Sequence, residues 1–218
     1  MVWTLLPHLT ACIAGNGVML LDLRQDRYFR VPAALTDETV DWLNKAGSAP
    51  PSRLLKLLEA KAVVRTSERS AVELNECRVI VPEQLPHPAE ASSMPLRGAL
   101  SVTRHVASSW ASLRTRSLHS LIASRRRRRG MAKTQQEAVS RETLLAYERA
   151  RRWVPLKKNC LLDSLALDCW LGDRLPDRTL VFGVTLEPFL AHCWLQTPDV
   201  LLNESYDRVR RFTPILVA

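Results

Sequence analysis

The most constraining feature of this sequence is a series of apolar segments in its last sixty residues. The first segment, KNCLLDSLALDCWLGDR, has helical spacing, with Asn159 as a candidate N-cap and Gly172 at its end. Three shorter apolar runs follow at residues 179–185, 189–196 and 200–203, and each has the length and composition of a strand. This order predicts an α+β fold in which a helix is followed by an antiparallel sheet.

The N-terminal third predicts a smaller module of strands followed by helices. Residues 18–23 and 27–31 are two apolar runs separated by turn residues, as in a hairpin. Helical patterns over residues 35–47 and 52–62 come next, and residues 62–66 have the composition of a short strand. We expect this β-β-α-α-β order to form a winged-helix-like module.

A proline-rich stretch separates this module from the rest of the chain. Residues 82–95 contain four prolines and show no periodicity, which is typical of a linker. We therefore expect one domain over residues 1–81 and a second over residues 96–218. The second domain begins with a basic helical part, and a further amphipathic helix is predicted at residues 134–154.

The formal net charge of +9 is concentrated in the middle of the chain. Residues 1–85 hold ten basic and ten acidic residues, whereas residues 95–158 hold sixteen basic and three acidic ones. The neutral N-terminal module therefore lacks the basic surface that binding to nucleic-acid phosphates requires. The run from Arg125 to Arg129 interrupts the helical pattern and carries no interleaved aromatics. We expect this run to be a solvated loop and expect no nucleic-acid partner.

The cysteines and the apolar runs of the sequence indicate the cellular compartment in which we expect the protein. The five cysteines are an odd number, are scattered, and include no CxxC pair, which argues against a disulfide framework and a structural zinc site. No apolar run reaches the ~18 residues that a membrane-spanning helix needs. The first residues have no Lys or Arg before their apolar stretch, unlike a secretory signal. We expect a reduced, cytoplasmic protein.

Cys160 and His192 are candidates for a nucleophile and its base. Cys160 falls in the first turn of the predicted helix, where the helix dipole and the neighbouring Lys157 and Lys158 favour a thiolate. Cys169 lies in the middle of the same helix, where packing is the natural role. His192 is the only histidine in the last sixty residues. Taken singly, either residue is explained as well by a role in the core.

A third group is needed to orient the imidazole, and two acids compete for that role. A three-residue loop at residues 197–199 would place His192 opposite Glu204, with Cβ atoms ~5 Å apart. Asp199 would then lie in the turn, out of reach, so we expect Glu204 to be the partner. His192 and Cys193 point to opposite faces of a strand and cannot readily share a metal ion, so no metal is expected.

Together these residues resemble the lasso peptide biosynthesis B proteins, in the form that fuses a precursor-recognition domain to a leader peptidase. The matching segments are CLLDSLAL (160–167), FGV (182–184), EPFLAHCWL (187–195) and NE (203–204). The resemblance implies a transglutaminase-like, papain-like cysteine protease core. It further implies Cys160 as the nucleophile, His192 as the base and Glu204 at the acid position, where the family usually has Asp.

The N-terminal segment LLDLRQDRYFRV is similar to the small peptide chaperone of pyrroloquinoline quinone biosynthesis. This similarity implies that residues 1–81 recognise the leader segment of a precursor peptide. The apolar side chains expected to contact the leader are Leu21, Leu23, Tyr28, Phe29, Val31, Leu54 and Leu58.

The resemblance implies removal of the leader from a ribosomally made lasso peptide precursor, which frees the core peptide for macrocyclisation. An asparagine-synthetase-like lasso cyclase would be the partner. The sequence has no GxxxxGK[ST] phosphate loop, so we expect no bound cofactor and any ATP dependence to act through that cyclase. Three alternatives stay open: a non-catalytic adaptor that delivers the precursor, the same fold running amide or acyl transfer, and a nucleic-acid-binding winged-helix protein.

Overall fold

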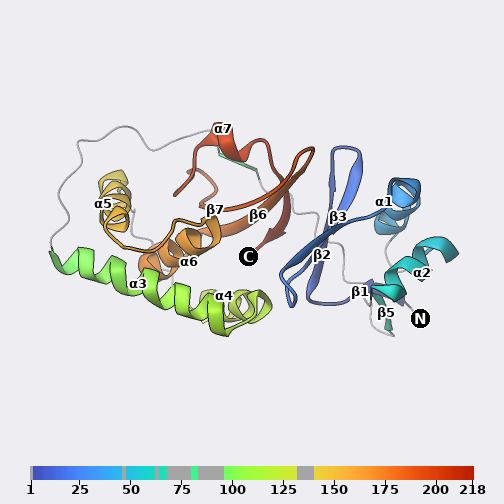
Figure 1. The fold of residues 1–218 in the computed structure, drawn as a ribbon, viewed down its shortest axis with the longest axis horizontal. Helices are drawn as coiled ribbons and strands as arrows, with labels where there is room; N and C mark the ends of the chain where they lie inside the picture. Colours follow the sequence, from blue (N-terminus) through green and yellow to red (C-terminus); the bar gives the residue numbers. More distant parts are fainter. Residues whose placement is uncertain (1, 46–47, 62–63, 68–79, 83–95, 132–139) are drawn as a thin grey trace.

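The computed structural model describes residues 2–45, 48–61, 64–67, 80–82, 96–131 and 140–218. Within these residues the strands form a two-stranded sheet, β1-β5, and two three-stranded antiparallel sheets, β2-β3-β4 and β7-β6-β8. Helices α1 and α2 lie at the N-terminal end of the molecule, and α3 to α6 lie at the other end (Figure 1). The α+β arrangement expected from the sequence is therefore present.

The N-terminal elements are β1 (Val2–Leu5), β2 (Leu9–Ala14), β3 (Gly17–Asp22), β4 (Arg27–Arg30), α1 (Thr36–Asn44), α2 (Ser52–Ala60) and β5 (Val64–Ser67). The expected hairpin, both helices and the strand after them are confirmed. The structure also contains two strands that were not predicted: β1, which pairs with β5, and β2, which pairs with β3. The meander with two helices is established, whereas the winged-helix interpretation stays a prediction.

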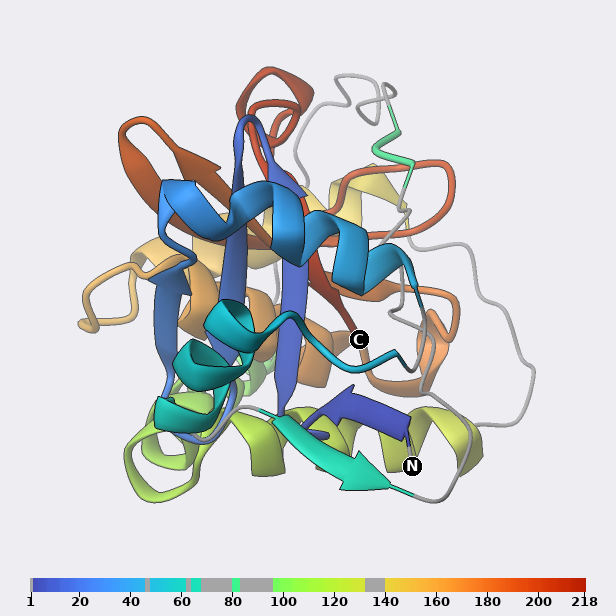
Figure 2. The same ribbon diagram turned by 90° about the vertical axis from the view of Figure 1, so that its right-hand side faces the viewer.

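Strand β3 joins the two halves of the molecule because both of its faces are buried. Met19 and Leu21 belong to the large core that includes the C-terminal sheet and α6. Val18 and Leu20 face the other way and pack under α1 and α2. Figure 2 shows these two helices in front of the β2-β3-β4 sheet, with the C-terminal half behind it. The sheet of the expected N-terminal domain thus shares a hydrophobic core with the expected C-terminal domain.

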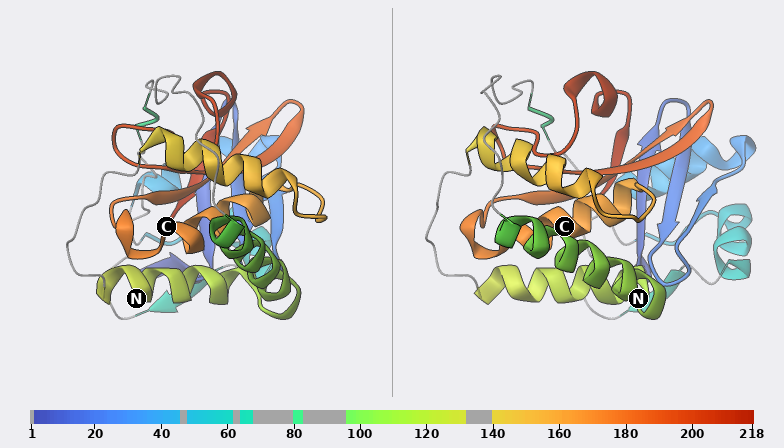
Figure 3. Two further views of the ribbon diagram at one scale, coloured as in Figure 1. Left: turned by 90° about the vertical axis from the view of Figure 1, so that its left-hand side faces the viewer. Right: turned by 60° about the vertical axis from the view of Figure 1, so that its left-hand side comes forward.

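The C-terminal elements are α3 (Leu96–Thr115), α4 (Leu118–Met131), α5 (Arg141–Arg152), α6 (Cys160–Leu171), β6 (Thr179–Leu186), β7 (Phe189–Gln196), α7 (Tyr206–Val209) and β8 (Thr213–Val217). Helix α6 packs on β7, and α3 packs on α6 and α5. Figure 3 shows α3, α4 and α5 on the outer side of α6. The helix predicted from Asn159 to Gly172 is confirmed, and Gly172 ends it with a positive φ of 55°.

One of the three predicted C-terminal strands is wrong. Residues 179–186 and 189–196 form β6 and β7, but in residues 200–203 only Leu201 makes a bridge, to Gln196. The third strand is β8, which pairs with β6 on the side away from β7. Apolar composition alone does not distinguish residues 200–203 from β8 as the third strand, because only the fold determines which segment reaches the free edge of β6.

The arginine run is also a correction, since it is part of helix α4 rather than a loop. Arginine is a good helix former, and Arg125 is held in place by an ion pair with Asp168 of α6. Arg126, Arg127 and Arg128 are exposed on the same helix.

Two other expectations fall partly on residues that the structure does not describe. Residues 83–95 of the expected linker lie outside them, so the domain boundary stays a prediction. Residues 134–139 of the helix predicted at 134–154 also lie outside, and α5 occupies its second half. Among the described residues, no helix combines the length and apolarity needed to cross a bilayer.

Candidate active site

The site begins at the first residue of α6. Asn159 caps this helix: its side-chain oxygen accepts hydrogen bonds from the backbone N–H groups of Leu161, at 2.9 Å, and Leu162, at 3.3 Å. Cys160 is therefore the first helical residue, where unpaired N–H groups and the helix dipole favour a negative charge. Its side chain is partly exposed.

Polar side chains fix the start of α6 against β7, which is an edge strand of its sheet. Ser164 is fully buried and donates a hydrogen bond to the backbone oxygen of Cys193 at 3.3 Å. Asn203 donates to Ser164 Oγ at 2.8 Å, and its side-chain oxygen accepts from the N–H of Leu195 at 2.8 Å. These bonds satisfy the outer edge of β7 and set the position of the segment that carries Glu204.

His192 and Glu204 form a short hydrogen bond. The distance from His192 Nε2 to Glu204 Oε2 is 2.6 Å, and the histidine side chain is 6% exposed. The imidazole lies beside the rings of Trp194 and Phe212, at centroid distances of 6.2 and 5.3 Å. Gly183 of β6 is the cross-strand partner of His192. A Cβ atom on residue 183 would lie 2.7 Å from the Cβ of Phe212. A glycine at this position therefore leaves room for the ring that packs on the imidazole.

Glu204 is the expected partner of His192, but the strand register from which this pair was predicted is wrong. Gln196 bridges to Leu201, one residue beyond the expected pairing. Glu204 nevertheless reaches His192 because the chain leaves strand geometry after the bridge and bends back toward the imidazole. Asp199 lies in the turn, as expected, and its N–H donates to Thr197 Oγ1 at 3.3 Å.

Hydrogen bonding moves the pKa values of Cys160 and His192 in opposite directions. Hydrogen bonds from Cys193 and from His192 lower the pKa of the Cys160 thiol to about 4, although burial opposes them. Burial alone would lower the pKa of His192, but hydrogen bonds to Cys160 and Glu204 outweigh it and raise that pKa to about 9. Between these values the site holds a thiolate beside an imidazolium, the state of an activated cysteine nucleophile.

Two neighbouring groups maintain this ion pair. Burial raises the pKa of Glu204, but its hydrogen bond with His192 and the charge of Arg208, 3.5 Å away, outweigh burial and lower the pKa. The hydrogen bond to Cys160, together with burial, raises the pKa of Cys193. Glu204 thus remains a carboxylate that accepts from the imidazole, and Cys193 remains a thiol that donates to Cys160.

Sequence reasoning missed Ser164, Asn203 and the contact of Cys193. Alternation along a strand indicated that Cys193 faces away from His192, and both residues nevertheless contact Cys160. This is understandable because α6 packs on β7, whose outer edge also bonds Ser164 and Asn203. A buried serine four residues after the cysteine is a weak signal in a sequence. The hydrogen bonds across α6 and β7 exist only in the fold.

The residues expected to bind a leader peptide fall into two groups. Five are buried and build the core of the molecule: Leu21, Leu23, Val31, Leu54 and Leu58. Tyr28 and Phe29 on β4 are partly exposed. Only these two offer surface to a peptide in this conformation, and leader binding itself stays a prediction.

Among the described residues, no group of three or more His, Cys, Asp or Glu side chains is arranged to hold a metal ion. The described cysteines, Cys12, Cys160, Cys169 and Cys193, form no disulfide with one another.

A family model matches the part of the chain that carries this candidate site. The model of the transglutaminase-like superfamily matches residues 102–217, a range that runs from α3 into β8 and includes Cys160, His192 and Glu204. No curated protein sequence and no solved structure matches the chain. Since the match extends over more than half of its length, the chain belongs to the transglutaminase-like superfamily, which includes cysteine proteases.

Proposed function

We propose that this protein is a cysteine endopeptidase that removes the leader from a lasso peptide precursor. The observation that carries the proposal is the arrangement of Cys160 and His192 as a thiolate–imidazolium pair, with Glu204 2.6 Å from the imidazole. The superfamily match supports cysteine chemistry. The lasso-specific part rests on the sequence resemblance of both halves of the chain.

The chemistry follows from the positions of these groups. The Cys160 thiolate attacks the scissile carbonyl carbon, and His192 gives its proton to the leaving amine as the peptide bond breaks. Water then attacks the carbonyl carbon of the resulting thioester while neutral His192 takes a proton from the water, and the carbon–sulfur bond breaks to release the acid and restore the Cys160 thiolate. Glu204 holds the ring through Nε2, which leaves Nδ1 as the nitrogen that serves Cys160.

The developing oxyanion needs hydrogen-bond donors. Asn159 already accepts from the N–H groups of Leu161 and Leu162, and the N–H of Asp163 donates to the Asn159 carbonyl. The N–H of Cys160 is the remaining donor of this first turn. We assign it to the oxyanion, where a single donor contributes about 2.7–4 kcal/mol.

The leader would bind as an added strand on β4. Among the described strands, β4 pairs with β3 alone, so its other edge offers backbone groups to an added strand. Arg30 of β4 approaches Glu187 in the β6-β7 turn to 3.5 Å, and Tyr28 lies against Phe189 of β7. A peptide held on β4 therefore starts beside the sheet that carries His192. Tethering raises its local concentration at the site.

We predict that the neighbouring reading frames encode a short precursor peptide and an asparagine-synthetase-like cyclase, and the test uses both. Wild-type protein should release the leader, detected by mass spectrometry, and a thiol-reactive peptide warhead should label Cys160. The His192→Ala variant should be labelled far more slowly. Rapid labelling that does not depend on His192, together with an intact precursor, would favour the non-catalytic adaptor instead.

Leader docking is tested separately with full-length Cys160→Ala protein and a fluorescent leader. Tyr28→Ala in that background should weaken binding in fluorescence anisotropy, and Trp153→Ala, which removes an 88% exposed aromatic from the other half, should not. Equal affinity of the two variants would contradict docking on β4.

Acyl transfer is a second candidate, because the same thioester reacts with an amine as readily as with water when the amine is bound. The superfamily match is compatible with both outcomes. Product masses distinguish them: hydrolysis adds water to the released acid, and transfer adds the acceptor amine.

A further inference from the structure

A second group of charged side chains lies along α6, remote from Cys160. Arg125 of α4 and Arg178, which precedes β6, both pair with Asp168 of α6, at 2.9 Å and 2.6 Å. Asp168 is eight residues beyond Cys160, about 12 Å along the helix axis. All three side chains are buried, and the proposed peptidase mechanism uses none of them.

The pairing leaves positive charge in excess. Two guanidinium groups share one carboxylate, and Arg178 is otherwise occupied by backbone oxygens of Gly172, Leu175 and Asp168. Arg125 donates from Nε and Nη2, but its Nη1 is buried and has no hydrogen-bond partner among the described residues. A buried, unpaired donor on a charged group is costly unless a ligand satisfies it.

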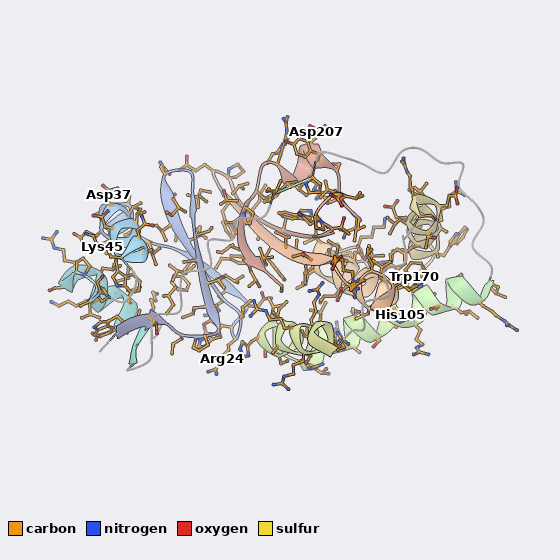
Figure 4. The ribbon with its side chains drawn as sticks, turned by 180° about the vertical axis from the view of Figure 1, so that it is seen from behind. Arg24, Asp37, Lys45, His105, Trp170 and Asp207 are labelled. Atoms are coloured by element: carbon orange, nitrogen blue, oxygen red, sulfur yellow. The ribbon has the colours of Figure 1, made fainter. Side chains whose placement is uncertain are left out.

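These residues line a cavity of about 280 Å³ between α3, α4 and the end of α6. The lining residues are Arg104, His105, Ser108, Arg125, Arg128, Asp168, Cys169, Gly172, Pro176 and Arg178. Four arginines thus face one acid. Figure 4 labels His105, which lines the cavity from α3, and Trp170, which follows the lining residue Cys169 on α6.

The cavity is organised from a buried base to an exposed rim. Arg125 is fixed at the base by Asp168, and the exposed Arg104 and Arg128 come from two different helices. Buried, fixed guanidinium groups together with further exposed ones are suited to a planar or tetrahedral oxyanion that accepts several hydrogen bonds. The volume is larger than one inorganic phosphate requires and lies at the small end of ligand pockets.

We propose that this cavity binds a phosphate group, either as a free inorganic ion or as the terminal phosphate of a small phosphorylated molecule. Arg125 Nη1 donates to it at the base, and Arg104 and Arg128 close around it from the rim. Because the cavity lies along the helix that begins with Cys160, the bound anion also stabilises the scaffold of the peptidase site.

The test measures binding by the full-length protein, independently of any cleavage. Inorganic phosphate, pyrophosphate and ATP are each titrated by isothermal calorimetry and by thermal unfolding, with potassium chloride at matched ionic strength as the control. At least one of the three should raise the midpoint of unfolding, and at equal concentration the tighter ligand should raise it further, so their ranking identifies the source of the phosphate.

A pair of charge-matched double variants locates the site. R104Q/R128Q removes the two exposed arginines of the rim, and R97Q/R127Q removes two exposed arginines of the same helices that do not line the cavity. The first should weaken phosphate binding at least tenfold, and the second should bind like wild type. Equal losses in both variants, or stabilisation no greater than that by chloride, would overturn the proposal. A failed cleavage assay would leave this result unaffected.

Discussion

The two ends of helix α6 carry charged groups that differ in accessibility. At the N-terminal end, Cys160 is partly exposed and takes part in an ion pair with His192. Further along, Asp168 is 2% exposed and lies between two buried arginines. The first group contains the proposed nucleophile, whose side chain is partly exposed, whereas the charges of the second group are held in buried ion pairs. Pairing of opposite charges therefore activates the Cys160 thiol at one end of α6 and fixes Asp168 with its two arginines near the other end.

The two groups differ in whether their members can change protonation state when an ion-pair partner is lost. The groups around Cys160 change protonation state at accessible pH, with pKa values of about 4 and 9. The guanidinium groups around Asp168 remain charged, so losing the carboxylate leaves buried charge without compensation. We therefore expect substitutions at the first end to change activity and substitutions at the second to change stability.

The largest expected effect follows from Cys160→Ala. Removing the sulfur removes the only nucleophile of the proposed mechanism, so leader release should fall below detection while leader binding persists. Cys169→Ala is the control, because that residue is on the same helix and lies outside the Cys160–His192–Glu204 group. Product mass spectrometry decides the matter. Complete cleavage by the Cys160→Ala protein would remove the basis for the peptidase.

Glu204→Gln should have the next largest effect on activity. The amide cannot stabilise the imidazolium, and we expect turnover to fall ~10²–10⁴-fold, by analogy with an Asp-to-Asn change in a catalytic triad. Glu204→Asp should retain more activity, and Asp199→Asn should be nearly silent because it lies in the turn. Initial rates on one precursor give the comparison, with circular dichroism as the folding control. A crippled Asp199→Asn variant beside an active Glu204→Gln variant would contradict the role of Glu204.

Asp168→Asn should act on stability instead. It leaves Arg125 and Arg178 buried without a counter-charge, and we expect the free energy of unfolding to fall by about 3–5 kcal/mol. Asp207→Asn, which breaks an exposed pair with Arg210, should cost no more than about 1 kcal/mol. Urea denaturation of both variants measures the difference. Similar losses would show that burial of Asp168 has little energetic consequence.

The smallest expected effect concerns the pH profile. Activity requires the Cys160 thiolate, which forms above a pKa of about 4, and protonated His192, which is lost above about 9, so kcat/KM should be bell-shaped between these values. Cys193→Ala removes the main influence that lowers the Cys160 pKa. Its acidic limb should therefore move to higher pH while the basic limb is retained. An unmoved acidic limb would show that His192 alone sets the thiolate pKa.

The sequence by itself determined the parts of this protein that depend on local chemistry. The Asn159 cap, the apolar stretch after it and Gly172 define α6 without any other segment, because capping and helix termination act within a few residues. The runs that became β3, β6 and β7 were recognisable from their apolar residues. The same local pattern placed Cys160 at the start of a helix.

The tertiary structure decided everything that depends on which segments meet. The strand beside β6 is β8 rather than residues 200–203, and the register of Gln196 with Leu201 differs from the expected one. Arg125 belongs to a helix and to a buried ion pair because Asp168, far away in the sequence, lies opposite it. Both faces of β3 are buried because two halves of the chain pack on it. Hydrogen bonds, burial and charge pairing act through space, so the sequence sets which residues are available and the fold sets which of them interact.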